Sequence, residues 1–154
     1  MKKIIMIMAL FVSSLFAGEI VLLDNNASDP VYILPLKEHS QWICEAKLKN
    51  GKKVQFISVK SMMQVYLHPE YFKSHDVLSA PIETLYVQDF LNGRRVEASR
   101  AVYLFGSRLV GPHGDDLIPF GSEASARVFM FKNGGTKILP FEKLTKGLIK
   151  YMDM

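Results

Sequence analysis

The chain has 154 residues, with 19 Lys or Arg against 15 Asp or Glu, and a formal net charge of +4. Two of the basic residues open the chain, and the remainder is close to neutral, with no basic stripe interleaved with aromatic side chains. Nucleic acid is therefore not expected as a partner, and the length suits one domain rather than several.

Residues 1–17 have the order of a secretory signal: two lysines, an apolar core from Ile4 to about Leu10, and a small residue, Ala17, at the end. The apolar core is shorter than the ~20 residues of a spanning helix, which disfavours a retained membrane anchor. No cysteine near the cleavage point offers a site for lipidation. We expect a periplasmic protein that is neither lipid-anchored nor an integral membrane protein, with residues 18–154 forming its single domain.

Short strands separated by turns are expected along the mature chain. Asn50-Gly51 and Asn92-Gly93 are pairs that favour tight hairpin turns. The expected strands cover residues 19–23, 31–36 (an edge or irregular segment, because of Pro35), 42–48, 53–58, 82–90, 101–105, 117–120 and 136–139.

Three helices are expected among these strands. Ser58 is the N-cap of a helix over residues 59–67, where apolar residues recur at helical spacing until His68-Pro69. Ser122 caps a second helix that runs to about Lys132 and stops at Gly134-Gly135. A last helix is expected from Pro140 to about Lys150.

Two stretches repeat the same order of motifs. Residues 48–54 match residues 90–96 in type, and Phe56-Ile57-Ser58 has a counterpart in Phe120-Gly121-Ser122. We therefore predict an α+β fold in which two packed ββα-like units form one compact domain.

The segment between strands 101–105 and 117–120 is rich in Gly and Pro, which leaves little room for regular structure. It presents His113, Asp115 and Asp116, whose side chains can bind a metal or another ligand. The alternative is a solvated loop tip without a ligand.

Cys44 is the single cysteine, so no intramolecular disulfide forms. The alternation of residues 42–48 points its side chain inward. In an oxidising compartment such a thiol is buried, paired between chains, or used as a soft metal ligand, and the sequence leaves these alternatives open. Met62 and Met63 lie on an apolar helical stripe and are interpreted as core residues, although one of them could reach a metal site.

Several short motifs in this order resemble the NosL family. They are Trp42-Ile43-Cys44, Asn50-Gly51-Lys52, Ser58-Val59, Tyr86-Val87-Gln88-Asp89-Phe90, Tyr103-Leu104-Phe105-Gly106-Ser107, Gly111-Pro112-His113-Gly114, Ile118-Pro119-Phe120 and Gly134-Gly135. The resemblance implies a fold of two small α+β units and an exported copper-binding accessory protein linked to maturation of nitrous oxide reductase. A metallochaperone of this type would have a periplasmic metalloenzyme or a membrane copper transporter as its partner.

The chain departs from the family pattern at two places. Ala46 stands where Cys-x-Met of the family has Met, and the loop has His113 and Asp115 where the family often has Met and His. Imidazole and carboxylate shift the preference of a site from Cu(I) toward Cu(II) or Zn(II). We predict a copper site formed by Cys44, His113 and Asp115, with its oxidation state open.

Two other classes of function are alternatives to copper binding. Cys44, His113 and a carboxylate are the components of a thiol catalytic set, but no nucleophile motif surrounds the cysteine, and an inward-facing strand residue lacks the helix N-terminus that lowers a thiol pKa. We therefore expect no enzyme. A metal-free periplasmic interaction module on the same fold is the alternative, and it would bury Cys44 and bind no metal.

Overall fold

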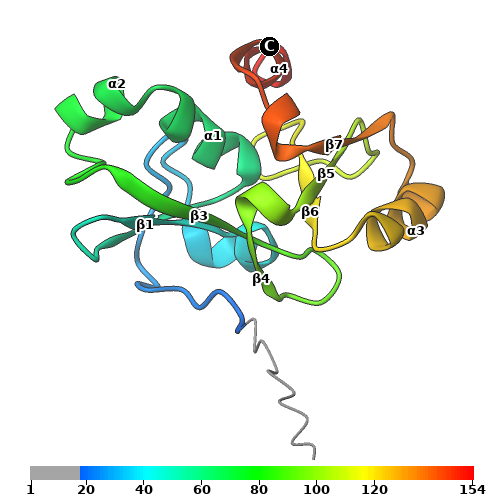
Figure 1. Cartoon of the computed structure of the whole chain (residues 1–154), viewed down its shortest axis with the longest axis horizontal. Coiled ribbons are helices and arrows are strands. Elements are labelled where there is room, and N and C mark those ends of the chain that lie inside the picture. The colour runs from blue at the N-terminus through cyan, green and yellow to red at the C-terminus, as the bar shows by residue number, and fades with distance from the viewer. Residues whose placement is uncertain (1–17) are drawn as a thin grey trace, which may run out of the picture.

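The computed structural model describes residues 18–154, which form two antiparallel sheets with helices packed against them (Figure 1). The secretory signal predicted for residues 1–17 lies outside the described residues. The strands are β1 (Cys44–Leu48), β2 (Lys53–Phe56), β3 (Ile82–Gln88), β4 (Arg95–Glu97), β5 (Val102–Phe105), β6 (Ile118–Phe120) and β7 (Lys137–Pro140). The α-helices are α1 (Val59–Leu67), α2 (Pro69–Ser74), α3 (Glu123–Asn133) and α4 (Lys146–Met152), and the 3-10 helices are η1 (Leu36–Trp42), η2 (Ala98–Arg100) and η3 (Phe141–Lys143).

The two sheets have related topologies. The first has the strand order β2-β1-β3-β4 and the second β6-β5-β7, so β1 and β5 each lie between an antiparallel partner on either side. In each unit a helix follows the second strand, and a third strand then returns to the sheet. The predicted α+β class with two packed ββα-like units is therefore confirmed, and each unit is completed by this third strand.

The β3–β4 hairpin belongs to the first sheet. Residues 90–96, which resemble the first hairpin turn in sequence, connect β3 to β4 rather than opening the second unit. The structural counterpart of the β1–β2 hairpin is the β5–β6 pair, in which Phe120 lies opposite Val102 as Phe56 lies opposite Cys44. A long loop, residues 106–117, replaces the tight turn in this second hairpin.

Local signals predicted the starts of both long helices. The Ser58 side chain accepts a hydrogen bond from Ser61 N, and the Ser122 side chain accepts one from Ser125 N. Each cap satisfies a backbone donor that has no partner within its helix.

Four elements differ from the expectation. Residues 19–23 form no strand, only an isolated bridge between Glu19 and Arg94. The strand expected over residues 31–36 is also wrong: Ile33 has a φ of 59°, which no strand allows, and only an isolated bridge between Ser28 and Pro35 forms before η1 begins. Pro69, expected to end a helix, also begins α2, because proline has no N–H to lose and its fixed φ suits the first turn. The last helix begins at Lys146, where Thr145 caps it.

The two units share their hydrophobic cores. Tyr103 of β5 and Ile149 of α4 belong to the same buried cluster as Cys44 and α1, and Trp42 packs with Phe120 of the second sheet. Helix α4 also packs against α1 (Figure 1). Because each unit lacks a complete core of its own, residues 18–154 form one domain.

No helix within residues 18–154 is both long enough and apolar enough to cross a membrane.

Candidate metal site

The loop of residues 106–117, here called the glycine loop, joins β5 to β6 and carries His113 at its tip. A tight turn forms this tip, in which Gly111 N donates a hydrogen bond to Gly114 O at 2.8 Å. A Cβ atom on Gly111 would lie 2.7 Å from the Cβ of Asp116. Glycine is therefore required at position 111 because Asp116 packs directly beneath the loop.

Asp116 is a buried carboxylate that is only partly satisfied. Its Oδ1 accepts hydrogen bonds from Lys60 N at 2.9 Å and from Leu117 N at 2.8 Å. Its Oδ2 is buried and has no hydrogen-bond partner among the described residues. Burial raises the pKa of Asp116 to about 6, although the neighbouring Ser58 hydroxyl, the two backbone hydrogen bonds and the positive charge of Lys60 lower it.

Cys44, the first residue of β1, is completely buried. Its Sγ donates a weak hydrogen bond to Trp42 O at 3.5 Å. Burial raises the pKa of the thiol well above its usual value, and the negative charges of Asp116 and Asp29 raise it further. Cys44 and Asp116 are therefore within electrostatic reach of each other, and a cation between them would favour the ionised form of both.

His113 and Asp115 lie on the surface of the same loop. The His113 ring is exposed and stacks on Tyr32, with 4.0 Å between ring centroids and 15° between planes. The Asp115 side chain is exposed at an open cavity of about 250 Å³ that Asp116, Thr136 and other residues also line.

The three predicted ligands thus occupy different depths: Cys44 in the core, His113 and Asp115 on the surface. Nowhere in residues 18–154 do three His, Cys, Asp or Glu side chains gather in a ready metal cluster. Asp116, which the sequence did not distinguish from Asp115, is the loop carboxylate that faces the interior. Sequence reasoning also missed Lys60. A lysine in the first turn of a helix is usually exposed, and nothing in the sequence marks this one as buried.

The largest soft side chains beside Cys44 are Met62 and Met63 on α1. Both are buried in the same cluster as Cys44, with 0% and 1% of their surface exposed, which confirms their interpretation as core residues.

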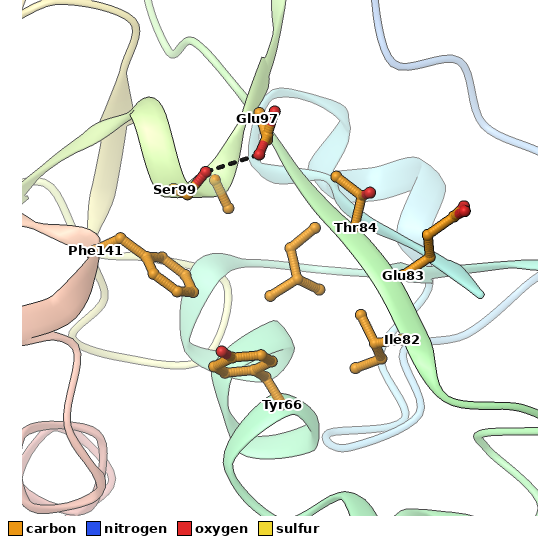
Figure 2. Close-up of a pocket in the computed structure, with 9 residues that line it drawn as sticks. Tyr66, Ile82, Glu83, Thr84, Glu97, Ser99 and Phe141 are labelled. Atoms are coloured by element: carbon orange, nitrogen blue, oxygen red, sulfur yellow. Dashed lines mark hydrogen bonds between the residues drawn. The ribbon is translucent and has the colours of Figure 1, made fainter. Parts of the chain in front are cut away.

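A separate cavity of about 290 Å³ lies between α1, β3, η2 and η3. Figure 2 shows the Tyr66 and Phe141 rings opposite β3, with Glu97 accepting a hydrogen bond from Ser99 at its rim. None of the residues that line it carries sulfur or imidazole. This cavity offers no soft metal ligand and lies apart from the glycine loop.

Comparison with known proteins identifies the class of the molecule. The family model described as NosL matches residues 21–149, so the chain belongs to the NosL family. A search of curated proteins gives no match.

Two solved structures are similar to this one. The first, the crystal structure of the copper chaperone NosL from Shewanella denitrificans, matches with a TM-score of 0.66 and 18% sequence identity, over 84% of this chain and 97% of that chain. The second, the solution structure of the apo-NosL protein from Achromobacter cycloclastes, has a TM-score of 0.49 and 23% identity, over 69% of this chain and 87% of that one. At this level of identity the first match establishes a shared fold.

Proposed function

We propose that this NosL-family protein is an exported copper-binding accessory protein or metallochaperone, which holds or delivers copper for a periplasmic metalloenzyme. Membership of the family and the fold shared with a protein described as a copper chaperone support this function. Export is proposed from the signal-like residues 1–17, and the absence of a cysteine at the cleavage point favours a protein without a lipid anchor. A periplasmic metalloenzyme or a membrane copper transporter is the proposed partner.

The observation that carries the proposal is the unpartnered Oδ2 of Asp116 beneath the glycine loop, with the Cys44 thiol within electrostatic reach. A buried carboxylate oxygen without a donor is costly, and a bound cation would supply the missing partner. This oxygen atom therefore suits a positively charged ion, and the thiolate and imidazole that would have to join it suit copper in particular.

We propose that His113 and Cys44 are the strong ligands, with Asp115 as a further ligand, and that the buried Oδ2 of Asp116 faces the ion. His113 is exposed and could take up the ion first, whereas Cys44 must lose a proton to bind it. Copper binding should therefore release a proton and become tighter as the pH rises. Because His113 stacks on Tyr32, the loop has to turn its imidazole toward the interior before both ligands act on one ion.

The test is an anaerobic Cu(I) titration against a competing chelator, with a Cu(II) titration in air, for the parent, His113→Ala and Cys44→Ser. We expect each variant to bind copper at least about tenfold more weakly, because each lacks one strong ligand of a site that has few ligands. His75→Ala is a matched control, because His75 is an exposed histidine at the C-terminal end of α2, and it is not part of the glycine loop. The proposal fails if the parent binds neither ion, or if both variants bind like the parent.

One observation favours the metal-free interaction module. Cys44 is 0% exposed and its thiol pKa is raised, which is the state of a structural cysteine. Such a module would bind no copper, and its thiol would stay unreactive toward a thiol reagent until denaturant is added. The copper titration of the parent protein decides between the two functions.

We propose no enzymatic activity. A nucleophilic thiol is activated by a lowered pKa, whereas the surroundings of Cys44 raise the pKa of its thiol.

A further inference from the structure

The edge of the first sheet is incomplete along the first part of β3. On one side, β1 pairs with β3 from Ile82 to Tyr86, whereas on the other side β4 pairs only with Tyr86 to Gln88. β4 ends at Glu97, and the chain then leaves the sheet as η2. Within residues 18–154, no strand therefore pairs with Ile82–Leu85 on the β4 side, and the backbone groups that face outward there are free to bind an added strand.

The cavity of about 290 Å³ described above lies along this unpaired edge. Ile82–Leu85 form one wall, and the Tyr66 and Phe141 rings, with 5.5 Å between their centroids, lie opposite (Figure 2). A second open cavity of about 310 Å³ shares Tyr66 and Ile82 with the first and continues over Pro81 and Leu78. The two cavities form one groove, here called the β3 groove, beside an edge of four residues that spans roughly 13 Å.

The charge of the β3 groove is mainly negative. The residues that line it include three glutamates and one lysine. Glu83 and Glu97 have 45% and 43% of their side chains exposed. Lys47 lies 2.6 Å from Glu83 and Arg100 lies 3.9 Å from Glu97, but a carboxylate accepts about four hydrogen bonds, so both keep free acceptor positions. The groove therefore suits a segment that carries apolar and positively charged side chains.

Two features of this edge oppose unselective pairing. Glu83 is the extra residue of a bulge, because Ile82 lies opposite Leu48 and Thr84 lies opposite Lys47. A bulge and a charged side chain are common protections of an exposed edge strand. An acidic strand is therefore repelled at this edge, whereas a basic strand is attracted.

We propose that the β3 groove is a docking site for an extended, basic segment of a partner protein, which adds to the first sheet as a strand beside Ile82–Leu85. Backbone hydrogen bonds hold such a segment, and the rings of Tyr66 and Phe141 bind its apolar side chains. A second copy of this chain is a poorer occupant, because symmetric pairing of two such edges would bring the glutamates of both copies together. Docking here is independent of copper, since no residue of the glycine loop lines the groove.

The probes are three five-residue peptides with blocked ends, in which lysine alternates with valine, leucine or phenylalanine. Each is titrated into the purified protein by isothermal titration calorimetry. Two control sets have glutamate in place of lysine, or the same side chains with every residue N-methylated, which removes the backbone donors that strand pairing needs. We expect at least one lysine peptide to bind, and its glutamate and N-methylated forms to bind at least about tenfold more weakly.

Three substitutions in the protein locate the site. Glu83→Gln and Glu97→Gln should each weaken binding of the lysine peptide about two- to fivefold, because each removes one half-exposed charge. Glu38→Gln, at an exposed glutamate of η1, changes the net charge equally and should bind like the parent. Ser99→Trp should weaken binding at least about tenfold, because Ser99 is exposed at the groove and a tryptophan there fills it.

Amide hydrogen exchange, followed by NMR, tests strand addition itself. Amides of Ile82–Leu85 that face away from β1 should exchange rapidly in the free protein and become protected when the lysine peptide binds. The inference is overturned if no lysine peptide binds, if the N-methylated peptides bind equally well, or if protection appears only outside β3. It is also overturned if sedimentation shows a dimer of the free protein that Ser99→Trp dissociates. If Ser99→Trp does not fold, Glu97→Gln and the N-methylated peptides decide.

Discussion

The two oxygens of Asp116 have opposite surroundings. Oδ1 accepts two backbone hydrogen bonds, whereas Oδ2 is buried without a donor. Burial of this half-satisfied group outweighs the hydrogen bonds and the Lys60 charge, so the pKa of Asp116 is raised to about 6. In the metal-free protein the ionised Asp116 carboxylate therefore lowers the stability of the folded state near neutral pH. A bound cation or a proton would remove this destabilisation.

The raised pKa predicts how Asp116 affects stability as the pH changes. The folded state holds the proton more tightly than the unfolded chain, whose value is near 3.8, so stability from this group increases as the pH falls through about 6 toward 4. We expect Asp116→Asn to lose this increase, which amounts to about 1 to 3 kcal/mol between pH 7.5 and pH 4.5. The measurement is urea denaturation of metal-free parent and variant across that range.

Asp115→Asn is the control for this comparison, because the neighbouring carboxylate is exposed. If parent and Asp116→Asn show the same change in unfolding free energy with pH, Asp116 is not the buried carboxylate described above.

Each of the two Asn-Gly hairpins turns on a glycine in the left-handed region. Gly51 has a φ of 83° and Gly93 a φ of 70°, and an added Cβ atom at either position would meet no other atom within 4 Å. A larger side chain at these turns is therefore opposed by backbone conformation alone and not by crowding.

Gly51→Val and Gly93→Val should each lower the free energy of unfolding by more than ~1 kcal/mol, because a β-branched residue strongly disfavours positive φ. Gly147→Ala in α4 provides the contrast. That glycine lies in a helix without positive φ, so alanine should stabilise the protein by about 0.5 to 1 kcal/mol. Chemical denaturation of the three variants is the measurement, and neutral results at both hairpins would contradict the turn geometry.

Local patterns predicted most of the regular elements. Alternation marked β1, the Asn-Gly turn marked its hairpin partner β2, helical spacing marked α1, and side-chain caps marked the starts of α1 and α3. The errors arose where a signal has two meanings: the proline after α1 both ends that helix and begins α2. The apolar run at residues 19–23 resembles a strand, but it makes only one isolated bridge, and the Gln55 side chain takes the place of strand pairing by hydrogen-bonding to Val21 O and Leu23 N.

The candidate site was less accessible to prediction than the fold. The loop and its polar residues could be found, because Gly and Pro mark a loop and imidazole and carboxylate are metal ligands. Neither the burial of Asp116 nor the buried charge of Lys60 could be found, because both depend on the packing of the loop onto α1 and α4. These contacts join residues far apart in the chain, and no periodicity within one segment encodes them.

Asp89 connects the two sheets across the middle of the molecule. It is buried, its Oδ1 accepts from Leu91 N and Asn92 N in the β3–β4 turn, and its Oδ2 accepts from Gly121 N at 2.7 Å between β6 and α3. Together with the shared cores, this side chain should make the two units unfold together.

We therefore expect a single unfolding transition, with Trp42 fluorescence and far-UV circular dichroism giving the same midpoint. Asp89→Ala should lower the unfolding free energy by about 2 to 4 kcal/mol, because three backbone donors lose a charged acceptor. Asp24→Ala is the control, since Asp24 is exposed and accepts its side-chain hydrogen bond from Asn26 N within its own turn. Two separate transitions in the parent would show that the units are independent.

Copper bound through Cys44 and the glycine loop would be seen in X-ray absorption at the copper edge of the Cu(I)-loaded protein. After excess metal is removed by gel filtration, we predict about one copper per chain, with sulfur together with nitrogen or oxygen among its donor atoms. A protein that retains no copper, or one whose copper has no sulfur donor, would contradict this prediction.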